Sequence, residues 1–325
     1  MKLTHIRDVL AVAELGSMRA AARHLQVAQP ALTRSIQEIE RELGVSLFER
    51  HARGVTTTPL GDHFLRRARI VRSELDRATE EIAQLSGGTT GQVVMAASTA
   101  PTIALMPSAM AAFRKQYPGA VLKVTESLFS GIEAQLLDGT IDFYVGPFDP
   151  GLTPASLQSE KLFEYNRFIL ARKGNPLAQA SSIADLADAQ WVRPLALSEN
   201  HFEADFDELF EARVGAPPKI VMYAHSALMT LMMVSNSDLV TILPQQWLEV
   251  PLPGDQLVRI EIAEQLPPLN MCVVRRRGMP LTPMAEYMSD AIRRAAAHYA
   301  YRLESLGAAS TRGGDPPNCR TGHPR

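Results

Sequence analysis

The stretch from Gly16 to Gly61 constrains the fold of this chain more than any other. It reads as two short helices joined by a tight turn and followed by a basic hairpin. Ser17 is a residue type that caps a helix start, and the alanine-rich run after it lets a second helix approach closely. Pro30 begins that second helix, because its missing amide would have no partner in a first turn.

The second helix has one apolar face and one polar face. Its apolar stripe, at the spacing of a helix, consists of Leu32, Ile36, Ile39 and Leu43. The polar face lies near the N-terminus, where amide donors favour a phosphate and short side chains reach base edges. Its members are Gln29, Thr33, Arg34 and Gln37. This is the face that a recognition helix presents to a major groove, although an ordinary helical hairpin with a solvated face is the commoner structure for two short helices alone.

Residues 47–57 favour the DNA-binding interpretation. They read as a small hairpin with Arg53 and Gly54 at its tip, a wing that carries cations to the flanking DNA backbone. Through Arg72 the chain has 12 Lys and Arg against 7 Asp and Glu, whereas the remainder has 21 against 28, and the net charge is only −2. The positive charge that attracts DNA is therefore confined to the N-terminal end.

Residues 1 to about 87 resemble the winged helix-turn-helix and linker helix of LysR-type transcriptional regulators. The family pattern is present in register as Ala21-Ala22-Arg23-His24-Leu25, Gln29-Pro30-Ala31-Leu32-Thr33, Leu47-Phe48-Glu49-Arg50 and Thr58-Pro59-Leu60-Gly61. Ala28 and Thr57 stand where the family frequently has a serine and a leucine. The resemblance implies binding to double-stranded DNA at an interrupted palindrome, with RNA polymerase as a further candidate partner. The implied DNA contacts are Arg19, Gln29, Pro30, Ala31, Thr33, Arg34, Gln37, Arg50 and Arg53.

A long helix is predicted from Pro59 to Leu85, with Thr58 as its N-cap. Its apolar stripe consists of Phe64, Ala68, Val71, Leu75, Ala78, Ile82 and Leu85. This stripe either pairs with a second copy of the chain or packs on the core of its own chain. The resemblance implies a dimerisation linker within a dimer or homotetramer. Four arginines of this helix could touch phosphates, and a solvated charged face explains them nearly as well: Arg66, Arg67, Arg69 and Arg72.

Residues 86–91 form a turn-rich hinge, and from Gln92 onwards strands alternate with helices. Such alternation indicates a parallel sheet with helices on both faces. The expected strands are residues 93–97, 121–126, 141–145, 168–172, 191–195, 219–224, 239–243, 258–262 and 270–276. The expected helices are residues 102–117 with an early break at Pro107, 132–137, 201–213, 227–235 and 283–306.

This second part resembles the effector-binding region of the same family, which consists of two α/β subdomains of periplasmic-binding-protein type. The matching marks include Phe113-x-x-x-Tyr117-Pro118 and Leu137-x-Gly139-x-Ile141-Asp142. We therefore expect an α/β multidomain protein with crossovers near residues 161–166 and 263–268. The expected domains are a winged helix-turn-helix (1–58), a linker helix (59–87), an effector-binding domain (88–305) and a disordered tail (306–325). Within the effector-binding domain we expect subdomain I at 92–162 and 268–305 and subdomain II at 163–267.

Ligands of open α/β sheets bind beyond the carboxyl ends of the strands. Hydroxyl groups at helix starts in these positions favour a carboxylate or another anion, although for each residue alone a cap or turn is the commoner role. The resemblance implies a small-molecule effector in the cleft between the subdomains. The candidate residues are Ser98, Thr99, Thr102, Phe129, Ser130, Phe148, Ser198, Phe202, His225 and Ser226.

Catalytic and cofactor patterns are absent from the sequence: it has no phosphate loop, dinucleotide fingerprint or nucleophile elbow. Its two cysteines, Cys272 and Cys319, disfavour a disulfide framework or a metal site. We expect no enzyme activity, no cofactor, no metal and no membrane segment, and a cytoplasmic location. The rival hypothesis, a solute-binding or enzymatic α/β protein with an incidental helical N-terminus, would need an export signal or a catalytic site.

Overall fold

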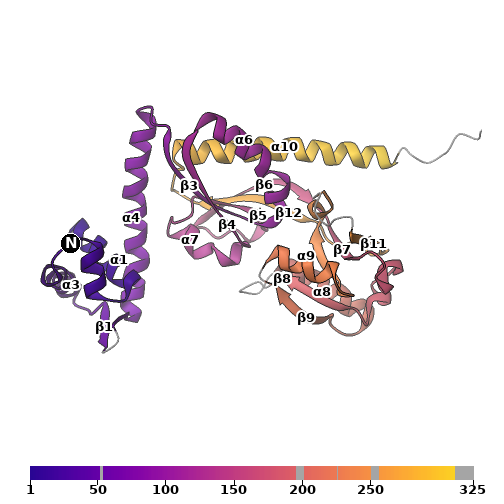
Figure 1. Cartoon of the computed structure of the whole chain (residues 1–325), viewed down its shortest axis with the longest axis horizontal. Coiled ribbons are helices and arrows are strands. Elements are labelled where there is room, and N and C mark those ends of the chain that lie inside the picture. The colour runs from indigo at the N-terminus through magenta and orange to yellow at the C-terminus, as the bar shows by residue number, and fades with distance from the viewer. Residues whose placement is uncertain (52–53, 195–200, 225, 250–255, 312–325) are drawn as a thin grey trace, which may run out of the picture.

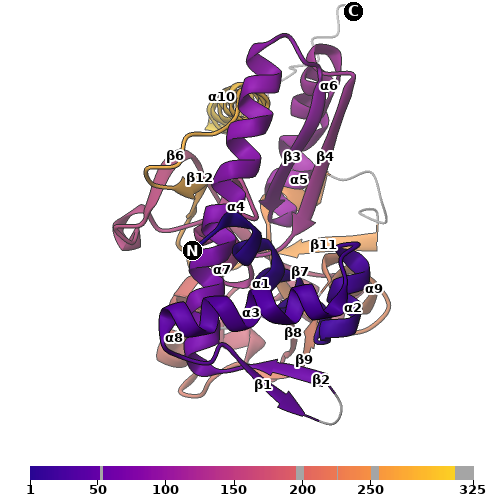
Figure 2. The same cartoon turned by 90° about the vertical axis from the view of Figure 1, so that its left-hand side faces the viewer.

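The computed structural model describes residues 1–51, 54–194, 201–224, 226–249 and 256–311. A small head, a long helix and a larger α/β region follow one another along the chain (Figure 1). The long helix stands between the head and the α/β region, so these two parts are held side by side (Figures 1 and 2).

The head consists of three helices and a hairpin. Its elements are α1 (Leu3–Leu15), α2 (Met18–His24), α3 (Gln29–Leu43), β1 (Phe48–His51) and β2 (Gly54–Thr57). The two strands pair antiparallel and project from the helices as the predicted wing (Figure 2). The helices enclose one apolar core, in which Val9, Ala21 and Ile39 are completely buried.

The long helix α4 (Pro59–Leu85) begins at a side-chain cap. The Thr58 hydroxyl accepts a hydrogen bond from the Gly61 amide at 2.9 Å and donates one to the Ser46 carbonyl at 2.8 Å. Gly61 lies against the Leu47 carbonyl, where any Cβ would collide with the oxygen. The helix start is therefore fixed to the entry of the wing, and Leu65 and Ala68 complete the head core.

Subdomain I is a five-stranded sheet in the order β4-β3-β5-β12-β6. Its strands are β3 (Thr90–Ala97), β4 (Gly119–Glu126), β5 (Phe143–Pro147), β6 (Leu157–Tyr165) and β12 (Leu269–Arg276). β3 is parallel to β4 and β5, whereas β12 is antiparallel to β5 and β6. The expectation of a parallel sheet therefore holds for β3, β4 and β5 and is wrong at β12, because this returning strand enters between β5 and β6 from the opposite direction.

Helices cover both faces of this sheet. They are α5 (Thr99–Ala104), α6 (Met106–Gln116), α7 (Glu133–Leu137) and α10 (Pro283–Thr311), with the 3₁₀ turns η1 (Phe129–Gly131) and η2 (Pro150–Leu152). The helix expected at residues 102–117 is two helices. The boundary falls at Leu105, because Pro107 lies at the second position of α6 and cannot continue the hydrogen bonds of α5.

Subdomain II contains two small sheets. Its strands are β7 (Arg167–Arg172), β8 (Gln190–Pro194), β9 (Lys219–Ala224), β10 (Thr241–Pro244) and β11 (Leu257–Ile260). Its helices are α8 (His201–Val214), α9 (Ala227–Ser235), η3 (Pro176–Gln179), η4 (Ala184–Leu186) and η5 (Gln245–Glu249). β8 and β9 are parallel, but β10 and β11 both pair antiparallel with β7, which again corrects the expected parallel sheet.

Two connections join the subdomains, from β6 to β7 and from β11 to β12. The first is shorter than the expected crossover at residues 161–166, because β6 continues in the sheet of subdomain I to Tyr165 and leaves only Asn166 between the strands. At the other end of the chain, α10 continues to Thr311, so the expectation of a disordered tail from residue 306 is wrong for residues 306–311. Residues 312–325 of that tail lie outside the described part. In that part, no helix has the length and apolar character needed to cross a membrane.

Candidate nucleic-acid interface and effector site

The recognition helix α3 has the two faces that its sequence predicts. Leu32, Ile36 and Ile39 are at most 1% exposed and fasten the helix to the head core. The proposed DNA contacts of this helix point away from the core: Gln29, Pro30, Ala31, Arg34 and Gln37 are exposed, and Thr33 is half-buried. Ala28 is the N-cap and has no capping side chain. Pro30 has no amide hydrogen and the Ala31 amide donates to the Ala28 carbonyl at 2.9 Å, so the Gln29 amide is the first-turn donor without a side-chain cap. A DNA phosphate is a suitable partner for such an amide.

A buried carboxylate fixes α3 to α1. Asp8 is 5% exposed and accepts hydrogen bonds from the Ser35 hydroxyl at 2.6 Å and from the Arg7 guanidinium at 2.8 Å. Because both carboxylate oxygens are occupied, the contact holds the two helices at one angle. Sequence analysis missed this pair; the available signal was an acidic residue at position 8 among the apolar Ile6, Val9 and Leu10.

The wing is positioned by a second carboxylate. Glu40 near the end of α3 accepts hydrogen bonds from the amides of Leu47 at 2.8 Å and Phe48 at 3.2 Å. The hairpin therefore leaves the helix in a fixed direction. Arg50 on β1 is exposed, as is Arg19 on α2, so both are free to approach a duplex from the head. Arg53, the remaining predicted contact, lies outside the described residues.

The apolar stripe of α4 is only partly used by its own chain. Phe64 and Ala68 pack on the head, but four large side chains further along are exposed: Val71, Leu75, Ile82 and Leu85. Val71 and Leu75 are 41% and 44% exposed, and Ile82 and Leu85 are 66% and 68% exposed. Such a continuous exposed stripe is unusual for a solvated helix.

The candidate effector residues of subdomain I lie at one edge of its sheet. Ser98 follows β3 and is buried, Thr99 begins α5, and Phe148 follows β5. Phe129 in η1 contacts Phe148 edge-on, with ring centroids 4.7 Å apart. Thr102 donates to the Ser98 carbonyl, and Ser130 lies beside Phe129 in η1. The strand ends therefore bring these residues together.

Two further residues at this edge escaped sequence analysis. The Tyr144 hydroxyl lies beside Ser98: a Cβ on Gly146 would collide with that hydroxyl and lie 3.0 Å from the Ser98 Oγ. Burial raises the pKa of Tyr144 well above its usual value, so its hydroxyl stays protonated and can donate. Glu126 at the end of β4 accepts a hydrogen bond from the Thr99 hydroxyl at 2.6 Å, which adds negative charge next to that group.

The candidate residues of subdomain II are less completely described. Ser226 is the N-cap of α9 and accepts from the Met229 amide, so it has the cap role. Phe202 lies on α8, and Ser198 and His225 lie outside the described residues. Contact between the two halves is made by α5, whose Ile103 packs on the subdomain II cluster that contains Trp247, and by α10, whose Tyr299 hydroxyl donates to Glu249 of η5. Among the described residues, no group of His, Cys, Asp and Glu side chains could hold a metal ion.

A head with an exposed recognition helix, a connecting helix and an effector-type α/β region are the parts of a DNA-binding transcriptional regulator. Comparison with family models gives the same result over most of the chain. Residues 3–62 match the bacterial regulatory helix-turn-helix proteins of the LysR family, and residues 86–297 match the LysR substrate binding domain. The chain therefore belongs to the LysR family of transcriptional regulators, and it is not an enzyme.

Two similar regulators align with most of the chain. The HTH-type transcriptional regulator GbpR of Azospirillum brasilense is 27% identical over 300 residues, which are 91% of this chain and 86% of the relative. The HTH-type transcriptional regulator TdfR of Cupriavidus pinatubonensis is 30% identical over 293 residues, covering 86% and 95%.

Solved structures show the same fold. The LysR family regulator CbnR has a TM-score of 0.65 at 22% identity, covering 91% of this chain and 99% of that one. Full-length CbnR in complex with its target DNA has a TM-score of 0.66 at 22% identity and covers 91% and 100%. The α/β multidomain fold expected from the sequence is thus confirmed.

Proposed function

We propose that this regulator binds an interrupted palindrome in promoter DNA through a pair of heads, acting in the cytoplasm, and that a small anionic effector alters this binding. One observation carries the proposal: α3 holds its predicted contact residues exposed on a head whose core and two carboxylates, Asp8 and Glu40, fix the helix direction. A fixed, exposed polar helix face is what base reading in a major groove requires.

Substitution of Arg34 tests the DNA part of the proposal. We expect Arg34→Ala to weaken operator binding by about 1–3 kcal/mol, as loss of a base or phosphate contact does. Fluorescence anisotropy at several salt concentrations measures both the affinity and the number of phosphate contacts. The matched control is Arg213→Ala, an exposed arginine on α8. Equal affinities of the Arg34 variant and the wild type would contradict the assignment of α3.

We propose that the heads are paired by α4. Its exposed stripe of Val71, Leu75, Ile82 and Leu85 has the helical spacing of a two-helix seam, and a second copy of the chain supplies an identical stripe. Two such dimers would give the tetramer expected from the family resemblance. RNA polymerase remains a candidate partner on the resemblance alone.

The effector part of the proposal rests on the sheet edge around Ser98. The buried hydroxyls of Ser98 and Tyr144 are neutral donors that suit an anion, whereas the carboxylate of Glu126 opposes one. We therefore expect an anionic effector to compete with Glu126 for the Thr99 hydroxyl. Calorimetric titration with a panel of small carboxylates should find at least one that binds, more weakly to Ser98→Ala and more tightly to Glu126→Gln. Binding of cationic ligands only would reject the anionic effector and leave the DNA assignment intact.

A further inference from the structure

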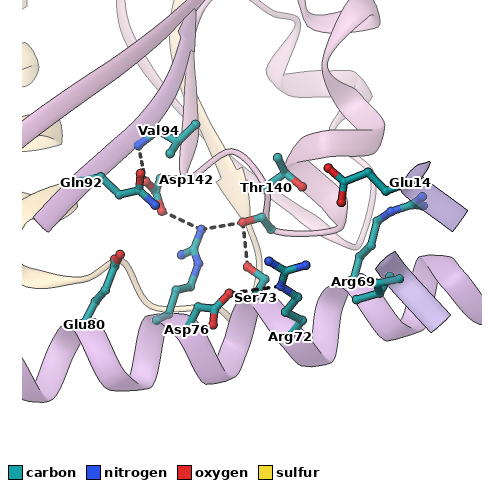
Figure 3. Close-up of a pocket in the computed structure, with 13 residues that line it drawn as sticks. Glu14, Arg69, Arg72, Ser73, Asp76, Glu80, Gln92, Val94, Thr140 and Asp142 are labelled. Carbon is teal, nitrogen blue, oxygen red and sulfur yellow. Dashed lines mark hydrogen bonds and ion pairs between the residues drawn. The ribbon is translucent and has the colours of Figure 1, made fainter. Parts of the chain in front are cut away.

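The polar face of α4 is fastened to subdomain I of its own chain. A pocket of about 390 Å³ lies between α4, α1 and this subdomain (Figure 3). It is lined by charged side chains of α4, among them Arg69, Arg72 and Asp76, and by the segment that leads into β5. Sequence analysis considered pairing, packing on its own chain and phosphate contacts for this helix, and it assigned no role to the residues that make this attachment.

Arg77 is the centre of the attachment. Its guanidinium lies 2.7 Å from the Asp142 carboxylate and donates to the Gly139 carbonyl at 3.3 Å. The side chains of Arg77 and Asp142 are each 11% exposed, so the ion pair is largely removed from water. The other carboxylate oxygen of Asp142 accepts from the Val94 amide of β3 at 2.8 Å. Arg77 is thus joined to β3 through the side chain of Asp142. Figure 3 draws the contacts of Asp142 as dashed lines.

Two uncharged contacts flank this ion pair on the same face of the helix. The Ser73 hydroxyl, one turn before Arg77, donates to the Gly139 carbonyl at 2.8 Å. Gln84, two turns after Arg77, is 9% exposed and accepts from the Met284 amide at the start of α10 at 3.0 Å. Both contacts reach backbone groups, which cannot move without moving the subdomain. The attachment therefore extends over three turns of α4.

This docked face is opposite the exposed apolar stripe. At ~100° per residue, positions 73, 77 and 84 project to one side of a helix and positions 71, 75, 82 and 85 to the other. One face of α4 is therefore held by its own subdomain I while the other remains available for a second copy. The two alternatives for this helix, packing on its own chain and self-pairing, are compatible with each other.

The contacts of Arg77 also connect to the two strands that end at the effector edge. Asp142 directly precedes β5, which ends before Phe148, and Val94 belongs to β3, which ends before Ser98. Hydrogen-bonded strands are rigid elements that carry coupling, so a displacement at Val94 or Asp142 reaches the effector edge.

We propose that Arg77 is a positioning residue: through Asp142 it holds α4, and with it the reading head, on strands β3 and β5, so that the head and subdomain I respond to one another. The link to DNA reading rests on the proposed function. The attachment itself does not, and it can be tested without DNA or an effector.

Electron-electron double resonance measures the attachment in the full chain. Spin labels are placed on the exposed sites Arg23→Cys in the head and Lys123→Cys in subdomain I, with Cys319→Ser to remove a competing thiol. Labelled chains are diluted with an excess of unlabelled chains, so that only distances within one chain are measured. We expect one narrow distance distribution for the parent protein, a broad one for Arg77→Met and for Asp142→Asn, and a narrow one for the conservative Arg77→Lys. Thermal unfolding confirms that each variant is folded. Distributions that stay narrow in both disrupting variants would overturn the attachment.

Amide hydrogen exchange, measured with and without operator DNA, tests whether DNA binding at the head affects subdomain I. Binding energies are reciprocal, so a head coupled to subdomain I transmits DNA binding to β3. We expect DNA to slow exchange of the Val94 amide by about fivefold or more in the parent and to leave it unchanged in Arg77→Met. An unchanged Val94 amide in DNA-bound parent protein would overturn the coupling. Absence of DNA binding would reject the proposed function instead and leave the spin-label result standing.

Discussion

Single buried, charged side chains hold the helices of the head in fixed orientations. Asp8 is the clearest case, because it is 5% exposed and its two oxygens serve Arg7 and Ser35 from different elements. We expect Asp8→Ala to lower the free energy of unfolding by about 1–3 kcal/mol, since the Ser35 hydroxyl loses its buried partner. Urea titration measures this loss, with the exposed Glu14→Ala of the same helix as the control. Equal losses in both variants would contradict a specific role for Asp8.

The buried thiol of Cys272 provides a second prediction for one residue. Burial raises the pKa of this thiol to about 12, and its Sγ donates to the Phe148 carbonyl. Only about one molecule in ten thousand then carries a thiolate at pH 8. We expect no measurable alkylation by iodoacetamide at pH 8 in folded Cys319→Ser protein, and rapid alkylation after unfolding in urea. Mass spectrometry distinguishes the two states, and fast alkylation of the folded protein would show that the thiol is accessible.

At the level of elements, α4 shows which features of a helix its sequence pattern predicts and which it does not. Its start at Thr58 and Pro59 and its apolar stripe follow from local rules, because cap chemistry and helical period act within a few residues. The opposite face gave no such signal. Ser73, Arg77 and Gln84 are ordinary residues for a solvated helix face, and only the approach of subdomain I gives them partners.

The stripe of α4 allows a direct test of pairing. We expect Leu75→Glu and Ile82→Glu to shift the protein to smaller species in analytical ultracentrifugation, because the charge would be buried in the seam. Affinity for a palindrome should then fall about tenfold or more, because one head no longer raises the effective concentration of the other, while affinity for a single half-site is retained. Ala83→Glu adds the same charge at an exposed position away from the stripe and serves as the control. If the stripe variants sediment as the parent does, pairing does not use this face.

For the whole molecule, the attachment of α4 predicts a dependence on pH. Burial raises the pKa of Asp142, against the opposing effects of Arg77 and the Val94 amide, and burial also raises the pKa of the nearby Glu80. Asp142 is therefore protonated at a higher pH in the folded protein than in the unfolded chain. As pH falls through that raised pKa, the ion pair with Arg77 is lost, and the spin-label distances should broaden.

The effect of pH on the free energy of unfolding is opposite to its effect on the attachment of α4 to subdomain I. Because the folded state binds the proton more tightly, the contribution of Asp142 to stability is largest below its ordinary pKa of 3.8 and declines as pH rises through the raised value. Asp142→Asn, which resembles the protonated form, should therefore fold and should have spin-label distances that no longer change with pH in this range. Further broadening of the Asp142→Asn distances in acid would indicate that another group, such as Glu80, is responsible.

The sequence alone determined the reading head, the start and stripe of α4, the fold class and the family, because these depend on periodicity, caps and turns within short windows. Only the tertiary structure decided the mixed strand directions, the short connection at Asn166, and the contacts of Arg77, Tyr144 and Glu126. Strand direction and long-range ion pairs join residues many positions apart, as Arg77 and Asp142 are. No local pattern specifies such partners, since a charged residue looks the same in a sequence whether water or another chain segment lies against it.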